Sequence, residues 1–113
     1  MISEAGHTPD DLPPGLLEEY LKSVGAQLAI LSGLADRLAT AGDDVQALDA
    51  LRREVHKVHG AAGSYGFWEA SRLAAEMEEA AKRWLAQPHD QVAERGVNAR
   101  RFVTRLAEAL RTG

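Results

Sequence analysis

The 113-residue sequence contains no cysteine, so it offers neither a disulfide framework nor a thiolate metal site. It also lacks a long apolar run: no segment approaches the roughly 18 residues that a membrane span requires. The N-terminal Met-Ile-Ser-Glu-Ala-Gly has neither the basic start nor the apolar centre of a signal peptide. We therefore expect a cytoplasmic protein with no membrane partner.

Positive charge is in short supply as well. The 13 Lys and Arg residues are outnumbered by 17 Asp and Glu, which gives a net charge of −4. Nothing in this balance favours general binding to nucleic acid, and we expect no such partner. An arginine cluster is expected on the last helix, but its acidic neighbours argue against a nucleic-acid site there; its members are Arg95, Arg100, Arg101 and Arg105.

The amino-acid composition favours helices. The chain is 45% apolar and 27% charged, which favours a compact fold, and it is rich in Ala, Leu, Glu and Arg rather than β-branched residues. Residues 1–12 are polar and have no apolar face, so we expect a flexible tail. Residues 13–113 are then long enough for one domain.

Apolar residues recur at alternating spacings of three and four in four segments, which indicates amphipathic helices. The first runs from Pro13-Pro14 to Ala41-Gly42, and Gly25 and Gly33 weaken it without breaking the period. Asp43 or Asp44 caps the second, which continues to Tyr65 and ends at Gly66. The third runs from Phe67 or Trp68 to Leu85. Asp90 caps the fourth, which ends near Arg111.

The expected inward residues of the first helix are Leu17, Leu21, Val24, Leu28, Leu31, Ala35 and Leu38; of the second, Leu48, Leu51, Val55, Val58, Ala62 and Tyr65. Those of the third are Phe67, Ala70, Ala74, Met77, Ala81 and Trp84; of the fourth, Val92, Ala99, Val103, Leu106 and Leu110. Four such stripes joined by short connections predict an all-α, antiparallel up-down four-helix bundle. Because no fifth stripe is left over, we expect a monomer.

The second helix carries its unusual residues on one stripe beside the buried face. Each member follows a core residue by one position; the stripe comprises Asp49, Arg52, His56, His59 and Gly63. Gly60 lies one turn beyond His56. Each glycine inside a helix costs about 1 kcal/mol relative to alanine, so a reason is expected. It is either close approach of another protein or close packing of helices, the latter chiefly for Gly63. We predict that His56 is exposed beside bare backbone, and that Gly60, Gly63 and Ser64 form a docking surface.

The stretch HKVHGAAGSYG resembles the motif of the histidine-containing phosphotransfer (HPt) domain family of two-component phosphorelays. That motif has an accepting histidine, usually a lysine three places on, a glycine four places on and another glycine ten places on. His56, Gly60 and Gly66 match, as do the small residues between them and the bulky Tyr65. The run from Glu69 to Glu78 is similar to the third helix of these bundles, and the resemblance covers residues 14–111.

One position departs from the family. His59 stands where lysine is usual, and the nearby Lys57 lies on a different side of the helix. His59 and Lys57 are both expected as neighbours of the phosphoryl group. Lysine is permanently charged, whereas histidine is largely neutral at pH 7, so the stabilisation of a phosphoryl group is expected to be weaker and pH-sensitive. Arg52, one turn before His56, is a further candidate to supply positive charge.

The resemblance implies that His56 takes a phosphoryl group from the aspartyl phosphate of a response-regulator receiver domain and passes it to another. The receiver domain can stand alone or belong to a hybrid histidine kinase. The receiver would supply Mg²⁺, and this chain would bind no cofactor. The sequence has neither a GxxxxGK[ST] nor a GxGxxG loop, so we expect a phosphoryl carrier rather than an enzyme that uses ATP.

Two alternatives remain open. The chain could be a phosphorylation-inactive, HPt-like bundle that binds receivers or helical partners. The replacement of the usual lysine by His59 keeps this alternative open. A zinc site could use His56 and His59, but would need His7 or His89 as a further ligand.

The remaining aromatic and charged residues are expected to have structural roles. The aromatic residues are expected in the core or at its edge. A solvated charged face is expected on the third helix, formed by Glu76, Glu78, Glu79, Lys82 and Arg83.

Overall fold

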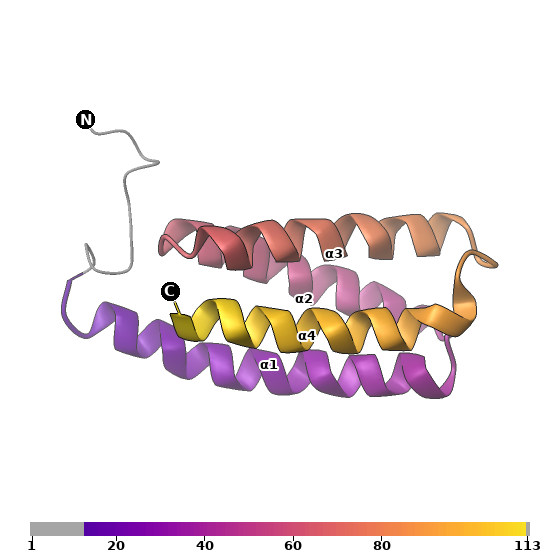
Figure 1. The fold of residues 1–113 in the computed structure, drawn as a ribbon, viewed down its shortest axis with the longest axis horizontal. Helices are drawn as coiled ribbons and strands as arrows, with labels where there is room; N and C mark the ends of the chain where they lie inside the picture. Colours follow the sequence, from indigo (N-terminus) through magenta and orange to yellow (C-terminus); the bar gives the residue numbers. More distant parts are fainter. Residues whose placement is uncertain (1–12, 113) are drawn as a thin grey trace.

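The computed structural model describes residues 13–112 and contains four long helices and no strand in that range. They are α1 (Leu16–Thr40), α2 (Val45–Ser64), α3 (Trp68–Ala86) and α4 (Arg95–Thr112), and a short 3₁₀ helix, η3 (Val92–Glu94), precedes α4. Successive helices run in opposite directions (Figure 1). The antiparallel up-down bundle expected from the sequence is therefore confirmed. The expected tail, residues 1–12, lies outside the described residues.

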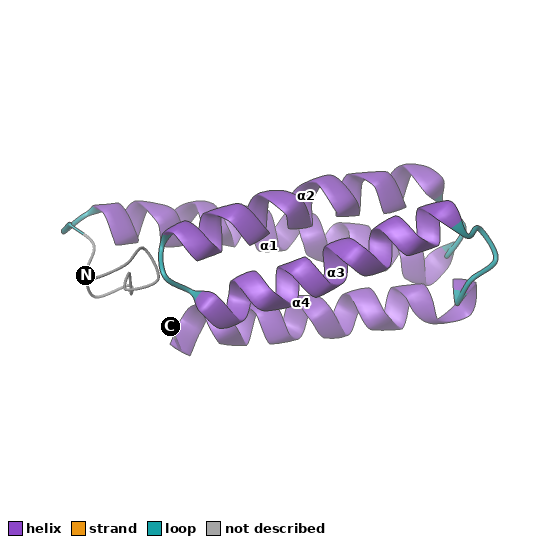
Figure 2. Ribbon diagram, turned by 90° about the horizontal axis from the view of Figure 1, so that it is seen from above, coloured by secondary structure: helices purple, strands orange, loops and turns teal. Residues whose placement is uncertain are grey.

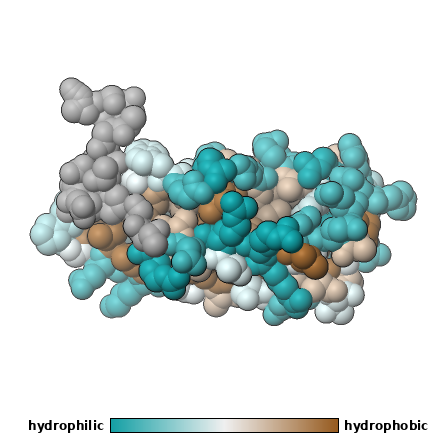
Figure 3. Space-filling model, in the orientation of Figure 1, coloured by the Kyte–Doolittle hydropathy of each residue, from teal (hydrophilic) through white to brown (hydrophobic). Residues whose placement is uncertain are grey.

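The helices form two closely packed pairs, α2 with α3 and α1 with α4, and all four run side by side along one direction (Figure 2). The apolar stripes expected for α2 and α3 are buried, apart from the half-buried Tyr65. Hydrophilic side chains cover much of the face shown in Figure 3, with hydrophobic patches between them. In residues 13–112 no helix is both long and apolar enough to cross a membrane.

The core of α1 differs from expectation at one turn. Leu21 is 40% exposed, whereas Tyr20, one position earlier, is buried. The Tyr20 ring stacks on Tyr65 with 4.2 Å between centroids and an interplanar angle of 8°, and it also meets Phe67. Stacking on aromatic residues at the α2–α3 turn buries more surface than Leu21 could, so the buried stripe rotates to include Tyr20.

The helix ends follow local chemistry. Asp44, rather than Asp43, caps α2 by accepting a hydrogen bond from the Ala47 backbone N–H at 3.0 Å. Gly66, with φ of 85°, follows α2 in the left-handed conformation that glycine adopts without strain. The expected cap of the fourth helix is wrong: Asp90 binds Arg83 instead, η3 intervenes, and α4 begins only at Arg95.

Arg95 also corrects the expected arginine cluster on α4. Its side chain is buried, whereas Arg100, Arg101 and Arg105 are exposed. The Arg95 guanidinium lies over the Trp84 ring. It donates hydrogen bonds to backbone carbonyls of the last turn of α3 and of both loops at this end of the bundle; the acceptors are Trp84, Gly42, Gln87, Pro88 and Asp90. Carbonyls at helix ends and loops need such donors because they have no partner within a helix. Arg95 is therefore a structural residue.

Candidate functional site

His56 lies in the middle of α2, and its side chain is 70% exposed. The exposure expected from the helical periodicity is therefore present. One turn further along, Gly60 has open space where a Cβ would stand. An incoming protein can thus approach the imidazole and the α2 backbone together.

The imidazole is held by one carboxylate on the neighbouring helix. His56 Nδ1 lies 2.7 Å from Oε2 of Glu78 on α3. The expectation that Glu78 belongs to a solvated face is wrong, because its side chain is only 9% exposed. Glu78 follows the core residue Met77 by one position, which turns it toward α2. The periodicity rule that predicted the His56 stripe would have found Glu78 if applied to α3.

The environment keeps the Glu78 carboxyl ionised. Its burial raises the pKa of Glu78, but the hydrogen bond and charge interaction with His56, together with His59 and Lys82, outweigh burial and lower the pKa below its ordinary value. An ionised carboxylate accepts hydrogen bonds and has none to donate. When the imidazole is neutral, its single proton is therefore assigned to Nδ1, and Nε2 keeps a lone pair. No hydrogen bond within residues 13–112 reaches that Nε2.

His59 shares the same carboxylate. Its Nδ1 lies 3.4 Å from Glu78 Oε1, and its side chain is 45% exposed. The His59 backbone carbonyl also accepts a hydrogen bond of 2.9 Å from the Ser71 hydroxyl on α3. These contacts fix the register of α2 against α3 at the height of the two histidines.

The expected phosphate-neighbouring cations pair within their own helix. Arg52 binds Asp49 at 3.0 Å, and Lys57 binds Glu54 at 3.1 Å. Sequence reasoning missed a third cation: the Lys82 ammonium on α3 lies 3.8 Å from Glu78 Oε2, the oxygen that binds His56. Lys82 was expected only on a solvated face, and nothing in the α2 motif signals it.

The three small residues expected to form a docking surface have different surroundings. Gly60 is open, as expected. A Cβ at Gly63 would lie 3.3 Å from the Ser71 hydroxyl and 4.0 Å from the Trp68 ring, so Gly63 faces α3 and its contribution is close helix packing rather than open backbone. The Ser64 hydroxyl donates to the Gly60 carbonyl at 3.0 Å.

The zinc alternative gains no support. Within residues 13–112 no group of three or more His, Asp or Glu side chains is arranged to hold a metal ion. His89 lies in the α3–α4 loop, away from the middle of α2, and His7 falls outside the described residues.

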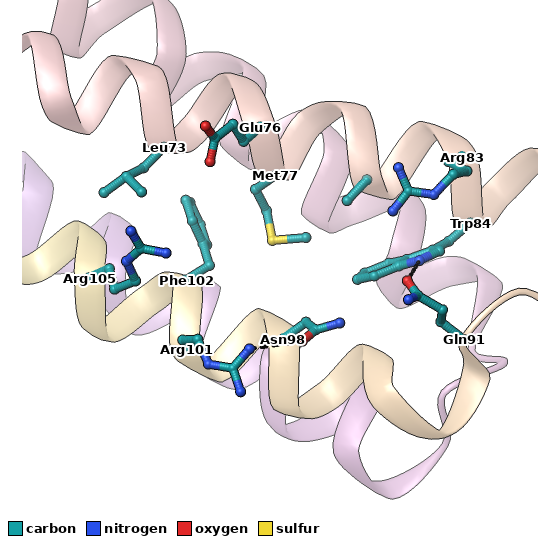
Figure 4. A pocket seen from close by; sticks show the side chains of 11 residues that line it. Leu73, Glu76, Met77, Arg83, Trp84, Gln91, Asn98, Arg101, Phe102 and Arg105 are labelled. Carbon is teal, nitrogen blue, oxygen red and sulfur yellow. Dashed lines mark hydrogen bonds between the residues drawn. The ribbon is translucent and has the colours of Figure 1, made fainter.

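A groove runs between α3 and α4 (Figure 4), with an apolar floor and arginines along its rim; its residues include Leu73, Met77, Trp84, Phe102, Arg101 and Arg105. None of its lining residues is a histidine, serine or cysteine. His56, His59 and Glu78 lie instead on the α2–α3 surface, which is the candidate site.

Comparison with known proteins bears on this arrangement. The family model described as the Hpt domain matches residues 15–113. No curated protein and no solved structure matches the chain. Domains of this family are helical bundles that carry phosphoryl groups, rather than enzymes, and they interact with response-regulator receiver domains. The chain belongs to the HPt domain family, with a role related to phosphotransfer in two-component signalling.

Proposed function

We propose that His56 is the phosphoryl acceptor of this chain and that it carries the group between aspartates of receiver domains in a phosphorelay. The observation that carries the proposal is the geometry of one side chain: His56 is 70% exposed, and a buried, ionised carboxylate binds its Nδ1. The other ring nitrogen is left as an accessible nucleophile.

In the transfer step, the His56 Nε2 lone pair forms a bond to phosphorus while the bond from phosphorus to the aspartyl oxygen of the receiver breaks. The electron pair of the broken bond stays on the aspartate. Because the imidazole enters as a neutral base, positive charge develops on the ring as the N–P bond forms. The Nδ1 proton stays in its 2.7 Å hydrogen bond to Glu78, whose negative charge stabilises that developing charge.

The remaining requirements are in-line alignment and compensation of the phosphoryl charge. Lys82 and His59 contact the same carboxylate as His56, so they are the nearest groups that can compensate the phosphoryl charge. Mg²⁺ would be brought by the receiver, since its aspartyl phosphate is the other reactant. The open backbone at Gly60 gives the receiver room to align its phosphoryl group with Nε2. Receivers that stand alone and receivers within a hybrid kinase offer the same chemistry.

The test is labelling by a receiver domain phosphorylated on its aspartate, followed by an acid-lability assay and mapping of the modified residue. We expect His56→Ala to fold and to lose the label, because the side chain is exposed. His89→Ala is the matched control: another exposed histidine, in the α3–α4 loop, whose loss should leave labelling unchanged.

Full acid-labile labelling of His56→Ala would contradict the proposal. A wild-type chain that binds the phosphorylated receiver but accepts no phosphate would instead support the inactive, receiver-binding alternative.

A further inference from the structure

The outward face of α1 differs from those of the other helices. From Ser23 to Ala35 the helix contains no charged residue, although much of this stretch is exposed; the exposed positions are Ser23, Gly25, Ala26, Ala29, Ile30, Ser32 and Gly33. The stretch is about 20 Å long at 1.5 Å per residue. The outward faces of α3 and α4 instead carry charged side chains along most of their length, such as Arg72, Glu76 and Arg101.

Two glycines on this face are not needed by the fold of the single chain. A Cβ at Gly25 or at Gly33 would meet nothing within 4 Å. Each glycine nevertheless costs the helix about 1 kcal/mol relative to alanine. Ile30 beside them is 50% exposed. A face that is smooth, uncharged and partly apolar is suited to contact with another helix at short range.

In place of the monomer expected from the four buried stripes, we propose that this α1 face binds the same face of a second copy of the chain, in an antiparallel dimer whose two-fold axis passes near Ala29. The choice of a second copy rests on the order of residues along the face. Lys22, Gly25, Ala29, Gly33 and Asp36 follow one another at spacings of three, four, four and three, which read the same in both directions.

In an antiparallel pair centred on Ala29, Gly25 lies opposite Gly33 of the partner subunit. Lys22 then lies opposite Asp36 of the partner subunit, and the symmetry repeats this pair of opposite charges at the other end. A parallel arrangement in register would instead place Lys22 opposite Lys22 of the partner subunit, and Asp36 opposite Asp36 of the partner subunit. The charges at the two ends therefore select the antiparallel, isologous contact.

Both charges are able to make this contact. Arg100 donates both of its hydrogen bonds to Asp36 Oδ1, at 3.1 and 3.0 Å, and no bond within residues 13–112 reaches Oδ2. No salt bridge within the same range joins Lys22 to a carboxylate. Asp36 can thus bind Lys22 of the partner subunit while it keeps Arg100.

The dimer leaves the phosphotransfer site open. α1 pairs with α4 and lies along the lower edge of the bundle in Figure 1, whereas His56 lies on α2 and Glu78 on α3. The dimer is therefore independent of the proposed function. A contact made by one helix from each subunit is small beside the interfaces of about 1,200–2,000 Å² that are typical of stable complexes, so we expect a weak, reversible dimer.

Analytical ultracentrifugation over a range of concentrations, up to about 1 mM, tests the proposal. We expect the wild-type chain to associate reversibly and Ala29→Arg to raise the dissociation constant at least about tenfold, because the two arginines meet at the symmetry axis. Val97→Arg is the matched control: Val97 is a 54% exposed apolar residue on α4, and its replacement should leave the dissociation constant unchanged.

A charge exchange tests the orientation. The exchange is made in an Arg100→Ala background, because Arg100 binds Asp36 within its own chain. In that background Lys22→Asp alone should weaken the dimer, because it places two carboxylates opposite each other, and Lys22→Asp combined with Asp36→Lys should restore it. A wild-type chain that is monomeric at every concentration would overturn the proposal. So would a dimer that Ala29→Arg leaves intact, or one that the double exchange fails to restore.

Discussion

Replacing Glu78 by glutamine tests the role of this carboxylate most directly. Glutamine keeps the size of the side chain and an acceptor oxygen, but it removes the negative charge that faces His56 Nδ1 at 2.7 Å. The positive charge that develops on the imidazole during transfer then loses its counter-charge. We expect the variant to remain folded and to transfer phosphate more slowly.

The structure sets the size of the effect. A hydrogen bond to a charged group contributes about 1.5–3 kcal/mol, which corresponds to roughly a ten- to hundredfold change in rate. The His56 side chain is 70% exposed, so solvent screens the interaction and favours the lower end. We therefore predict about a tenfold loss in the single-turnover rate of transfer from a phosphorylated receiver.

Glu79→Gln provides the control, since Glu79 is the next residue of α3 and its side chain is 73% exposed. A second measurement separates positioning from a general loss of structure. ¹⁵N chemical shifts of the His56 ring should report the Nδ1-protonated tautomer in the wild-type chain and a shift toward the other tautomer in Glu78→Gln. Equal transfer rates for Glu78→Gln and wild type, with an unchanged tautomer, would refute the reasoning.

Three further outcomes are expected. Arg95→Ala should lower the free energy of unfolding by about 3–5 kcal/mol in urea denaturation, because it leaves several carbonyls in both loops without a donor; a loss below about 1 kcal/mol would contradict this role. In Tyr65→Phe, Tyr20 is the one tyrosine left to titrate. Burial, with a smaller contribution from Tyr65, raises the pKa of Tyr20 to about 12 in the native chain. Absorbance at alkaline pH should therefore show a midpoint well above the ordinary value of 10, and stability should fall as the pH rises from 10 through 12, whereas a midpoint near 10 would show that the ring is solvated. Gly60→Leu should raise helix propensity yet weaken receiver binding, and calorimetry showing unchanged affinity would disprove the close approach at this position.

Periodicity predicted the fold well where each turn had one clear apolar candidate. The stripes of α2 and α3 satisfy this condition, and both are buried nearly as expected. At the start of α1 the rule had to choose between Tyr20 and Leu21, which are adjacent. The choice depends on stacking against Tyr65, a partner far along the chain, and local spacing contains no information about it.

The start of α4 was missed for a similar reason. Asp90 is a residue type that caps helices. The conformation of the chain around it, however, depends on Arg95, whose guanidinium donates hydrogen bonds to backbone carbonyls of two loops. A buried arginine of this kind cannot be distinguished from a surface one by its neighbours in sequence, since its acceptors are backbone atoms that any residue provides.

The candidate site was also only partly predictable, because local spacing places the residues of one helix and not their partners on another. His56 and the open Gly60 lie on one helix, so spacing alone placed them. Glu78 lies 22 residues from His56, and its contact depends on how α2 and α3 are rotated against each other. The spacing on α3 places Glu78 and Lys82 at the edge of its buried face, one position after Met77 and Ala81. The rotation is set by the buried residues on both helices together, so only the folded structure shows that Glu78 contacts the imidazole and that Lys82 contacts Glu78.

Lys82 also bears on the family's missing lysine. Its ammonium contacts the Glu78 oxygen that binds His56, so α3 provides a permanent positive charge close to the site where His59 replaces the usual one. We expect Lys82 to compensate for the positive charge that is missing at position 59. Lys82→Ala should then slow phosphotransfer about two- to fivefold, because a screened ionic contact contributes about 0.5–1 kcal/mol. Lys82 is 51% exposed, so a larger effect is not expected.

The same substitution should matter less in a His59→Lys background, where position 59 supplies the charge, and a double-mutant cycle on transfer rates measures the difference. Lys57→Ala is the matched control, because Lys57 pairs with Glu54 on the far side of α2 from this cluster. Additive effects of the two substitutions would show that the charges at positions 59 and 82 act independently, and the compensation across the two helices would then be wrong.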